Sequence, residues 1–380
     1  MISRRLFTHS CAAAGSLALT GFNPAWAQND NRIVIGQSAA FTGAAAQLGH
    51  QFHAGAKLWF DQTNDSGGVN GRLIEIKKMD DGYEPERCLA NTRQLIDDGV
   101  FALFGYIGTP TSMAALPLIK SEGIPFVAPF TGAMALREPH LKNVFHLRAS
   151  YNDETALIVK QLTHLGLKKI AVFHQNDAYG KAGLDGVTLA LATSGLMPIA
   201  AATVERNTVD VDAAVKKLTA AGPDAIVQIG TYKACAAFIR ASRKAGYGGT
   251  FYNVSFVGTK ALSDELGKEG AGVVVSQVVP SPYSSTRQIT REFAESIKKG
   301  GNNVDANFSS MEGYLAAKLF TEGLRRAGGG TLTRLGFIRG IQSMGSHSLG
   351  GFATQLSPTR HVASNFVELS MLVGDGRVRT

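Results

Sequence analysis

Five short segments of this 380-residue chain hold the residues best suited to chemistry, because each combines hydroxyl, aromatic and glycine residues directly after a predicted strand. In a parallel sheet, ligands bind outside the carboxyl ends of the strands, where helix N-termini direct unpaired N–H groups toward anions. One such segment alone is typical of an ordinary turn. Five together predict a cleft for a small molecule. The segments are GYIGTPTS (105–112), APFTGA (128–133), NDAYGKAG (176–183), IGTYKAC (229–235) and NVSFVG (253–258).

The sequence contains none of the familiar catalytic motifs. It has no P-loop and no Gly-x-Ser-x-Gly elbow, and Gly36, Gly43 and Gly49 are spaced too widely for a dinucleotide-binding loop. Lys233 and Cys235, at a predicted helix start, are the best candidates for an enzyme, because a helix N-terminus lowers the pKa of a thiol. A half-buried thiol at a helix start explains them more simply. We therefore expect a binding protein with no catalytic residue.

Two pairs of potential metal ligands also have simpler interpretations. His50 and His53 lie three residues apart on a predicted helix, but no acidic or cysteine partner follows at metal-ligand spacing, so we expect surface histidines. Asp80 and Asp81 follow a predicted strand and precede Gly82, which favours a turn before a helix over a metal-binding pair of carboxylates. We expect neither a metal site nor a cofactor.

The elements that position these residues follow from hydrophobic periodicity. From Arg32 onward, β-branched runs alternate with amphipathic helical stretches, which predicts a mostly parallel sheet covered by helices on both faces. The first series has strands at 33–37, 73–79, 101–105 and 125–128 and helices at 45–65, 84–98 and 113–121. A second series has strands at 169–174, 197–204, 225–230 and 250–254 and helices at 151–164, 181–194, 211–221 and 234–245. Two similar series predict two similar lobes.

The rest of the chain completes both lobes in this interpretation. A strand at 272–279 precedes three helical stretches with no long strand between them, so these helices need the first sheet to cover. The stretches 286–299, 310–327 and 333–343 follow a crossing back at Pro280, and 365–380 form a final strand pair around Gly374-Asp375-Gly376. Crossings near 148, 278 and 360 predict an α/β protein with two doubly wound parallel-sheet lobes joined by a three-strand hinge.

The first 27 residues have the three parts of an export signal. A basic start, MISRRLF, precedes the apolar run CAAAGSLALTGF and the small-residue site Ala25-Trp26-Ala27, and the start resembles a twin-arginine signal. The apolar run is about half of the roughly 20 residues that a membrane-spanning helix needs. We therefore expect cleavage near Gln28 and a soluble periplasmic protein.

The remaining 353 residues exceed what one hydrophobic core usually organises, so we assign 28–148 plus 280–360 to lobe 1 and 149–279 plus 361–380 to lobe 2. Their 36 basic and 30 acidic residues leave a net charge of about +6 without a long basic run, which argues against a nucleic-acid partner. Only Cys88 and Cys235 remain, too few for a disulfide framework. We expect two free thiols.

Four blocks of the sequence resemble a known family, and the similarity extends over nearly all of the mature chain. They are FTGAAAQLGHQFHAGAKLWFDQTNDSGGVNGRLIEIKKMDDGYEP (41–85), SEGIPFVAP (121–129), VFHLRAS (144–150) and DAYGKAG (177–183). The chain resembles the periplasmic substrate-binding proteins of branched-chain amino-acid (Leu/Ile/Val) type ABC transporters, which have the type I bilobal fold. The resemblance implies a monomeric, non-enzymatic receptor that closes over a solute and delivers it to an inner-membrane permease.

The resemblance also implies which residues bind the ligand. In the family, a hydroxyl and amides in the loop after the third strand hold the ligand carboxylate. This arrangement is physically reasonable, because hydroxyls and helix-start amides solvate an anion without a buried counter-charge. The matching position here is Thr109, with Thr111 and Ser112 close by. The next family loop contributes a backbone carbonyl and a threonine, and the second lobe contributes two tyrosines. The carbonyl position matches Phe130 and the threonine position matches Gly132, with Thr131 between them. The two tyrosine positions match Tyr179 and Thr231, and Tyr232 lies beside Thr231.

The largest departure concerns the acidic residue that pairs with the ammonium of an amino-acid ligand. Ser255 takes its place, and we expect no carboxylate nearby. A buried ammonium without a charged partner costs several kcal/mol. Together with Phe130 and Phe256, this favours a carboxylate with an apolar or aromatic body over a plain α-amino acid. A true branched-chain amino-acid binder and a periplasmic ligand sensor are the alternatives.

Overall fold

The computed structural model describes residues 31–300, 304–374 and 376–380. The predicted export signal at residues 1–27 lies outside the described residues, and Asn31–Thr380 form one compact unit. Within the described part of the chain, no helix combines the length and the apolar character needed to cross a membrane.

The first sheet is parallel throughout, which confirms the expectation from the alternating pattern. Its strand order is β2-β1-β3-β4-β5, so β1 lies inside the sheet and the chain builds outward from it in both directions. The strands are β1 (Arg32–Ala39), β2 (Leu73–Asp80), β3 (Ala102–Phe104), β4 (Phe126–Val127) and β5 (Val144–Phe145).

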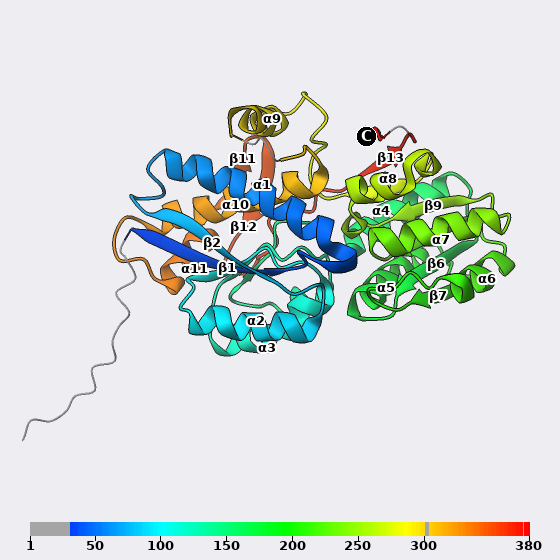
Figure 1. The fold of residues 1–380 in the computed structure, drawn as a ribbon, viewed down its shortest axis with the longest axis horizontal. Helices are drawn as coiled ribbons and strands as arrows, with labels where there is room; N and C mark the ends of the chain where they lie inside the picture. The colour runs from blue at the N-terminus through cyan, green and yellow to red at the C-terminus, as the bar shows by residue number, and fades with distance from the viewer. Residues whose placement is uncertain (1–30, 301–303, 375) are drawn as a thin grey trace, which may run out of the picture. The chain divides into compact units, whose positions relative to one another are not determined.

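Helices cover both faces of the first sheet (Figure 1). α2 (Pro85–Asp97) and α3 (Thr109–Ser121) pack together on one face, and α1 (Ala46–Asp65), α10 (Phe308–Ala327) and α11 (Arg334–Gln342) cover the other. α1 and α10 cross so closely that the crossing requires glycine. A Cβ on Gly55 would lie 1.8 Å from the Ser310 carbonyl oxygen, and a Cβ on Gly313 would lie 2.0 Å from the Phe52 carbonyl oxygen. α9 (Gln288–Gly300) also contacts α1. The helices after Pro280 therefore return to the first sheet.

The second sheet has seven strands in the order β14-β13-β10-β9-β8-β6-β7. The five strands from β6 to β10 are parallel, β13 is antiparallel to β10, and β14 is antiparallel to β13. The final pair confirms the predicted C-terminal strands, although Asp375 of the predicted turn lies outside the described residues. The strands are β6 (Ile170–Gln175), β7 (Ala200–Val204), β8 (Ala225–Ile229), β9 (Thr250–Asn253), β10 (Val274–Gln277), β13 (Glu368–Leu372) and β14 (Val378–Arg379).

The helices of the second lobe form two packed groups, as in the first. α4 contacts α5 and β10, while α6 contacts α7 and β7, and α7 also contacts α8. The chain leaves the first sheet after β5, returns to first-sheet helices after β10, and enters the second sheet again at β13. The helices are α4 (Tyr151–His164), α5 (Ala178–Ala192), α6 (Asp212–Ala220), α7 (Tyr232–Lys244) and α8 (Thr259–Leu266).

Three helices that carry predicted site residues begin earlier than the sequence predicted. α3 begins at Thr109 instead of 113, because Pro110 is favourable in a first helical turn. α5 begins at 178 instead of 181, because the Asp177 carboxylate caps it by accepting from the backbone N–H of Tyr179 at 2.9 Å. α7 begins at Tyr232 instead of 234. Predicted site residues thus lie in first helical turns, where backbone N–H groups have no intrahelical partner.

Some elements carry no clear sequence pattern and were not predicted. The strands β11 (Gly345–Leu349) and β12 (Phe352–Leu356) form a separate antiparallel hairpin, and β11 is largely polar. Its turn uses Gly350 and Gly351, whose φ angles of 63° and 86° suit glycine. The others are β5, α8 and the 3-10 helices η1 (Gly43–Ala45), η2 (Met134–Leu136), η3 (Ser255–Val257) and η4 (Gly267–Gly270).

Candidate ligand-binding site

Four aromatic side chains, Phe130, Phe256, Tyr179 and Tyr83, meet in one buried group, here called the aromatic cluster. The ring centroid of Phe256 lies 4.6 Å from that of Tyr179, 5.7 Å from that of Phe130 and 5.8 Å from that of Tyr83. Phe130 follows β4 of the first sheet, and Phe256 lies in η3 after β9 of the second. Three predicted site residues from both lobes are therefore in one place, and Tyr83 joins them from the turn after β2.

A pair of hydroxyls lies at the carboxyl edge of the first sheet. Thr109 Oγ1, in the first turn of α3, lies 2.7 Å from Thr131 Oγ1, which follows β4. Both threonines are fully buried. Burial raises the pKa of Tyr151 to about 12, and the Thr131 and Thr109 hydroxyls oppose the rise. The Tyr151 ring packs 5.4 Å from Tyr179, so the hydroxyl pair borders the aromatic cluster.

Gly132 has a packing role in the same turn. Its carbonyl oxygen accepts a hydrogen bond from the Tyr151 backbone N–H at 2.8 Å. A Cβ at Gly132 would lie 2.6 Å from both this nitrogen and the Tyr151 ring. The glycine is therefore required because Tyr151 approaches the backbone closely.

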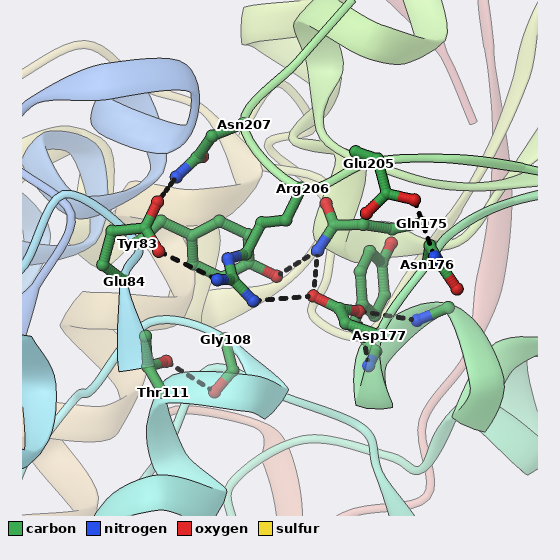
Figure 2. A network of polar contacts seen from close by, with 12 residues as sticks. Tyr83, Glu84, Gly108, Thr111, Gln175, Asn176, Asp177, Glu205, Arg206 and Asn207 are labelled. Atoms are coloured by element: carbon green, nitrogen blue, oxygen red, sulfur yellow. Dashed lines mark hydrogen bonds and ion pairs between the residues drawn. The ribbon is translucent and has the colours of Figure 1, made fainter. Parts of the chain in front are cut away.

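The other two predicted residues of α3 differ in what their hydroxyls contact. Thr111 Oγ1 donates to the carbonyl oxygen of Gly108 at 3.1 Å (Figure 2). It also donates to the carbonyl oxygen of Ile107 at 2.5 Å, so this hydroxyl is bonded to its own backbone. Ser112 Oγ is buried and has no hydrogen-bond partner within the described residues. Gly108, with φ of 102°, leaves room for the Tyr83 ring, which would lie 2.3 Å from a Cβ there.

Thr231 and Tyr232 lie at the start of α7 and are both buried. Thr231 is the N-cap residue, but its side chain makes no capping hydrogen bond. Burial raises the pKa of Tyr232, and a hydrogen bond with the Gln47 backbone opposes the rise. Tyr232 therefore contacts the start of α1 in the first lobe instead of extending the hydroxyl pair.

The expectation that no carboxylate lies near Ser255 is wrong. Glu154, from α4, accepts hydrogen bonds from the Ser255 backbone N–H at 2.7 Å, from Ser255 Oγ at 3.0 Å and from Ser276 Oγ at 2.6 Å. Glu154 is fully buried. Burial raises the pKa of Glu154, while Arg148 and these three donors oppose the rise. The carboxylate escaped prediction because it lies about a hundred residues before Ser255 in the sequence.

Arg148 connects this carboxylate with the aromatic cluster. Its Nη2 donates to Ser255 Oγ at 2.5 Å, its Nε lies 3.1 Å from Glu312 Oε1, and its guanidinium carbon lies 4.3 Å from the Phe130 ring centroid. Burial disfavours the charged guanidinium, but Glu312 and Glu154 outweigh burial and raise the pKa of Arg148. In the sequence, Arg148 was marked only by its place as the one arginine of the segment VFHLRAS (144–150), which resembles the family.

A polar network joins the two lobes beside the aromatic cluster (Figure 2). Arg206 Nη2 and Asn207 Nδ2, from the loop after β7, donate to the two carboxylate oxygens of Glu84 at 2.8 and 2.6 Å. Gln175 Nε2, at the end of β6, donates to the Tyr83 hydroxyl at 3.3 Å. These contacts join loops that lie far apart in the sequence.

The two aspartates at the end of β2, Asp80 and Asp81, shape the turn, in agreement with the preferred interpretation. Asp80 Oδ1 accepts from the backbone N–H groups of Phe41 at 2.8 Å, Thr42 at 3.0 Å and Gly82 at 3.0 Å. Asp81 accepts from Ser38 Oγ at 2.8 Å and from the Tyr83 backbone N–H at 2.9 Å. The turn thereby positions Tyr83 for the aromatic cluster.

The remaining candidate groups lie in other environments. His50 is exposed, as expected, but His53 is partly buried, with its Nδ1 at 2.7 Å from Gln37 Oε1, and burial lowers its pKa to about 4. Cys88 and Cys235 are free thiols, and both are fully buried, although a half-buried thiol was expected at Cys235. Burial raises the pKa of the Cys235 thiol, which argues against a nucleophile, and Lys233 is exposed.

Comparisons with known proteins agree with this architecture. The family model described as periplasmic binding protein matches residues 32–373. The Leu/Ile/Val-binding protein homolog 3 of Brucella melitensis is 26% identical over 298 residues, which cover 78% of this chain and 79% of that protein.

Two solved structures show the same fold. A possible leucine/isoleucine/valine-binding protein from Rhodopirellula baltica SH 1 has a TM-score of 0.88 and 31% identity, covering 92% of this chain and 96% of the other. A solute binding protein of an ABC transporter from R. palustris, solved in complex with benzoate, has a TM-score of 0.81 and 19% identity, covering 92% and 95%. At that identity the second similarity establishes the fold alone. The family match over nearly all the described residues, with two lobes that meet at an aromatic cluster, shows that this chain belongs to the periplasmic binding protein family, with the type I fold of the Leu/Ile/Val-binding proteins.

Proposed function

We propose that this protein is the periplasmic receptor of an ABC transporter for a small carboxylate with an apolar or aromatic body, and that it delivers this solute to an inner-membrane permease. Members of the family are the solute-binding components of such transporters. The observation that carries the proposal is the aromatic cluster, formed by Phe130 and Tyr83 from one lobe and Tyr179 and Phe256 from the other, beside the Thr109–Thr131 hydroxyl pair.

The contacts of Glu154 support a ligand without an ammonium group. Its carboxylate already accepts three hydrogen bonds from Ser255 and Ser276 and lies close to Arg148. These three donors occupy most of the roughly four acceptor positions of a carboxylate, so an ammonium would compete with them and with Arg148 for the charge of Glu154. The aromatic rings offer apolar contact area to the body of the ligand instead.

Closure follows from the distribution of these residues between the lobes. A ligand that contacts Phe130 and Thr131 of the first lobe together with Tyr179 and Phe256 of the second gains more free energy in the closed state than in an open one. Occupancy therefore increases the closed population, which is the form that a permease recognises. The protein acts as a monomer with no cofactor in this proposal.

The test is isothermal titration calorimetry of protein freed of bound solute by unfolding and refolding. The panel contains benzoate, phenylacetate, octanoate and leucine, because the acids share a carboxylate and differ in body. We expect at least one acid to bind about ten-fold or more tightly than leucine, a difference of about 1.4 kcal/mol. Tight binding of leucine with no binding of the acids would instead identify a branched-chain amino-acid receptor.

A further inference from the structure

We propose that Arg148 is the specificity-determining residue of the site: its guanidinium binds the ligand carboxylate, and Glu312 is the counter-ion that this carboxylate replaces. The proposal rests on the proposed function, because it takes the ligand to be a small carboxylate. It departs from the carboxylate site implied by the family resemblance, in which hydroxyls and helix-start amides alone hold the anion.

The first observation is the number of donors that Arg148 leaves unused. The side chain is 1% exposed, yet Nε and Nη1 make no hydrogen bond within the described structure, and only Nη2 has one, to Ser255. A buried donor left unsatisfied costs about 1–3 kcal/mol. A guanidinium presents its N–H groups as a planar fork that matches a carboxylate, so an acidic ligand supplies the partners that these nitrogens lack.

The second observation is the position of the guanidinium. It stacks over the Phe130 ring at 4.3 Å, and Phe130 and Phe256 have ring centroids 5.7 Å apart. Ser255, the hydrogen-bond partner of Arg148, immediately precedes Phe256. A carboxylate on Arg148 therefore places the ligand body against these two rings.

The third observation separates the two acids beside Arg148. Glu154 is held in place by three donors from Ser255 and Ser276. Glu312, on α10, approaches Arg148 through the 3.1 Å contact with Nε, and this is its one ion pair among the described residues. That contact lacks hydrogen-bond geometry, since Nε has no hydrogen-bond partner. Glu312 is thus the more weakly held acid and the one that a ligand carboxylate can replace.

The experiment compares acids with their neutral amides, because the two share shape and differ in charge. Benzoate, phenylacetate and octanoate are titrated beside benzamide, phenylacetamide and octanamide. The proteins are the parent, Arg148→Lys, Arg148→Gln, Glu312→Gln and the double variant Arg148→Met/Glu312→Gln. The double variant removes both charges of the ion pair, because loss of the arginine alone leaves buried carboxylates unpaired and endangers folding. Arg240→Gln is the matched control, since it removes a positive charge from an exposed ion pair on α7.

We expect the parent and Arg240→Gln to prefer an acid over its amide by about ten-fold or more. Arg148→Lys retains part of this preference, whereas Arg148→Gln and the double variant lose it while binding the amide as the parent does. Glu312→Gln binds the acid more tightly than the parent does, because the ligand carboxylate no longer competes with Glu312 for the Arg148 guanidinium. Its affinity for the amide is the same as that of the parent.

Three outcomes contradict the inference. Retention of the acid preference without Arg148 would show that hydroxyls and amides carry the charge, and an equal loss of acid and amide binding would show a structural role. If none of the three Arg148 variants folds, unchanged or weaker acid binding by Glu312→Gln overturns the inference. Binding of leucine but of no acid by the parent is a separate result, because it defeats the proposed function itself.

Discussion

The Glu84 carboxylate, after β2, lies 2.8 Å from Arg206 Nη2, after β7, and this ion pair joins the two lobes beside the aromatic cluster. Asn207 Nδ2 binds the second oxygen of the same carboxylate at 2.6 Å. The side chains of Glu84 and Arg206 are 41% and 26% exposed, so solvent screens the pair. Such pairs contribute about 0–1 kcal/mol each. In the proposed mechanism, such contacts adjust the balance between open and closed states without determining what binds.

The first prediction concerns this ion pair. Replacing Glu84 by Gln removes the negative charge but leaves a side-chain oxygen that can accept from Asn207. We expect the affinity for an accepted ligand to fall by about two- to five-fold. The loss should shrink at high salt, because exposed ion pairs are screened. Calorimetry at low and high salt measures both effects. Lys57→Gln, in an exposed ion pair on α1, is the control; a loss of the same size in both variants would rule out a specific contribution from the Glu84 contact.

The second prediction concerns the hydroxyl pair and Tyr179. Thr109→Ala and Tyr179→Ala should each weaken ligand binding by about ten-fold or more, which corresponds to about 1.4 kcal/mol. Thr111→Ala provides the comparison, because the Thr111 hydroxyl is bonded to its own helix backbone, and we expect its binding to match that of the parent. If Thr109→Ala and Tyr179→Ala bind as tightly as the parent, the site lies elsewhere.

The third prediction concerns Gly132. A methyl group there would lie 2.6 Å from the Tyr151 backbone nitrogen, so Gly132→Ala must displace Tyr151. We expect a loss of stability of about 1–3 kcal/mol, as for other overpacked sites, together with weaker binding. Urea unfolding measures the first effect and calorimetry the second. Gly248→Ala is the control, because no atom lies within 4 Å of a Cβ there; equal stability of the two variants would contradict the close approach of Tyr151.

The fourth prediction follows from the burial of Glu312. Burial raises its pKa to about 7, although Arg148 opposes the rise. This folded-state pKa lies above the ordinary value of 4.5, so protonated Glu312 stabilises the folded state. The stabilisation is complete below pH 4.5 and is lost as the pH rises through about 7. Glu312→Gln stays neutral throughout. The free energy of unfolding of the parent should therefore fall relative to Glu312→Gln between about pH 5 and pH 8.

Urea denaturation of both proteins at several pH values measures this difference. Asp81, whose pKa burial raises to about 6, titrates in the same range, but it is present in both proteins and its contribution cancels. Parallel stability curves for the parent and Glu312→Gln would show that Glu312 does not change its protonation state in this range.

The sequence alone determined the local elements and the family. Alternating β-branched and amphipathic runs depend on neighbours within a few residues, so they predicted two mostly parallel sheets, most of the helices between their strands and the C-terminal strand pair. The same pattern marked the segments after the strands. Because the carboxyl ends of parallel strands share one edge of a sheet, these segments were expected to form one cleft. The family resemblance then pointed to the positions of Phe130 and Tyr179 within them, and Phe256 followed from the departure at Ser255.

Only the tertiary structure decided how these residues meet and what charge accompanies them. Glu154, Glu312 and Ser255 lie far apart in the sequence and meet at Arg148 because α4, α10 and η3 pack around one point. No periodicity records such a contact, since periodicity reports which face of an element is buried and not what lies against that face. The burial that makes Arg148 a candidate for binding a carboxylate is therefore a property of the packed lobes and not of any segment of the chain.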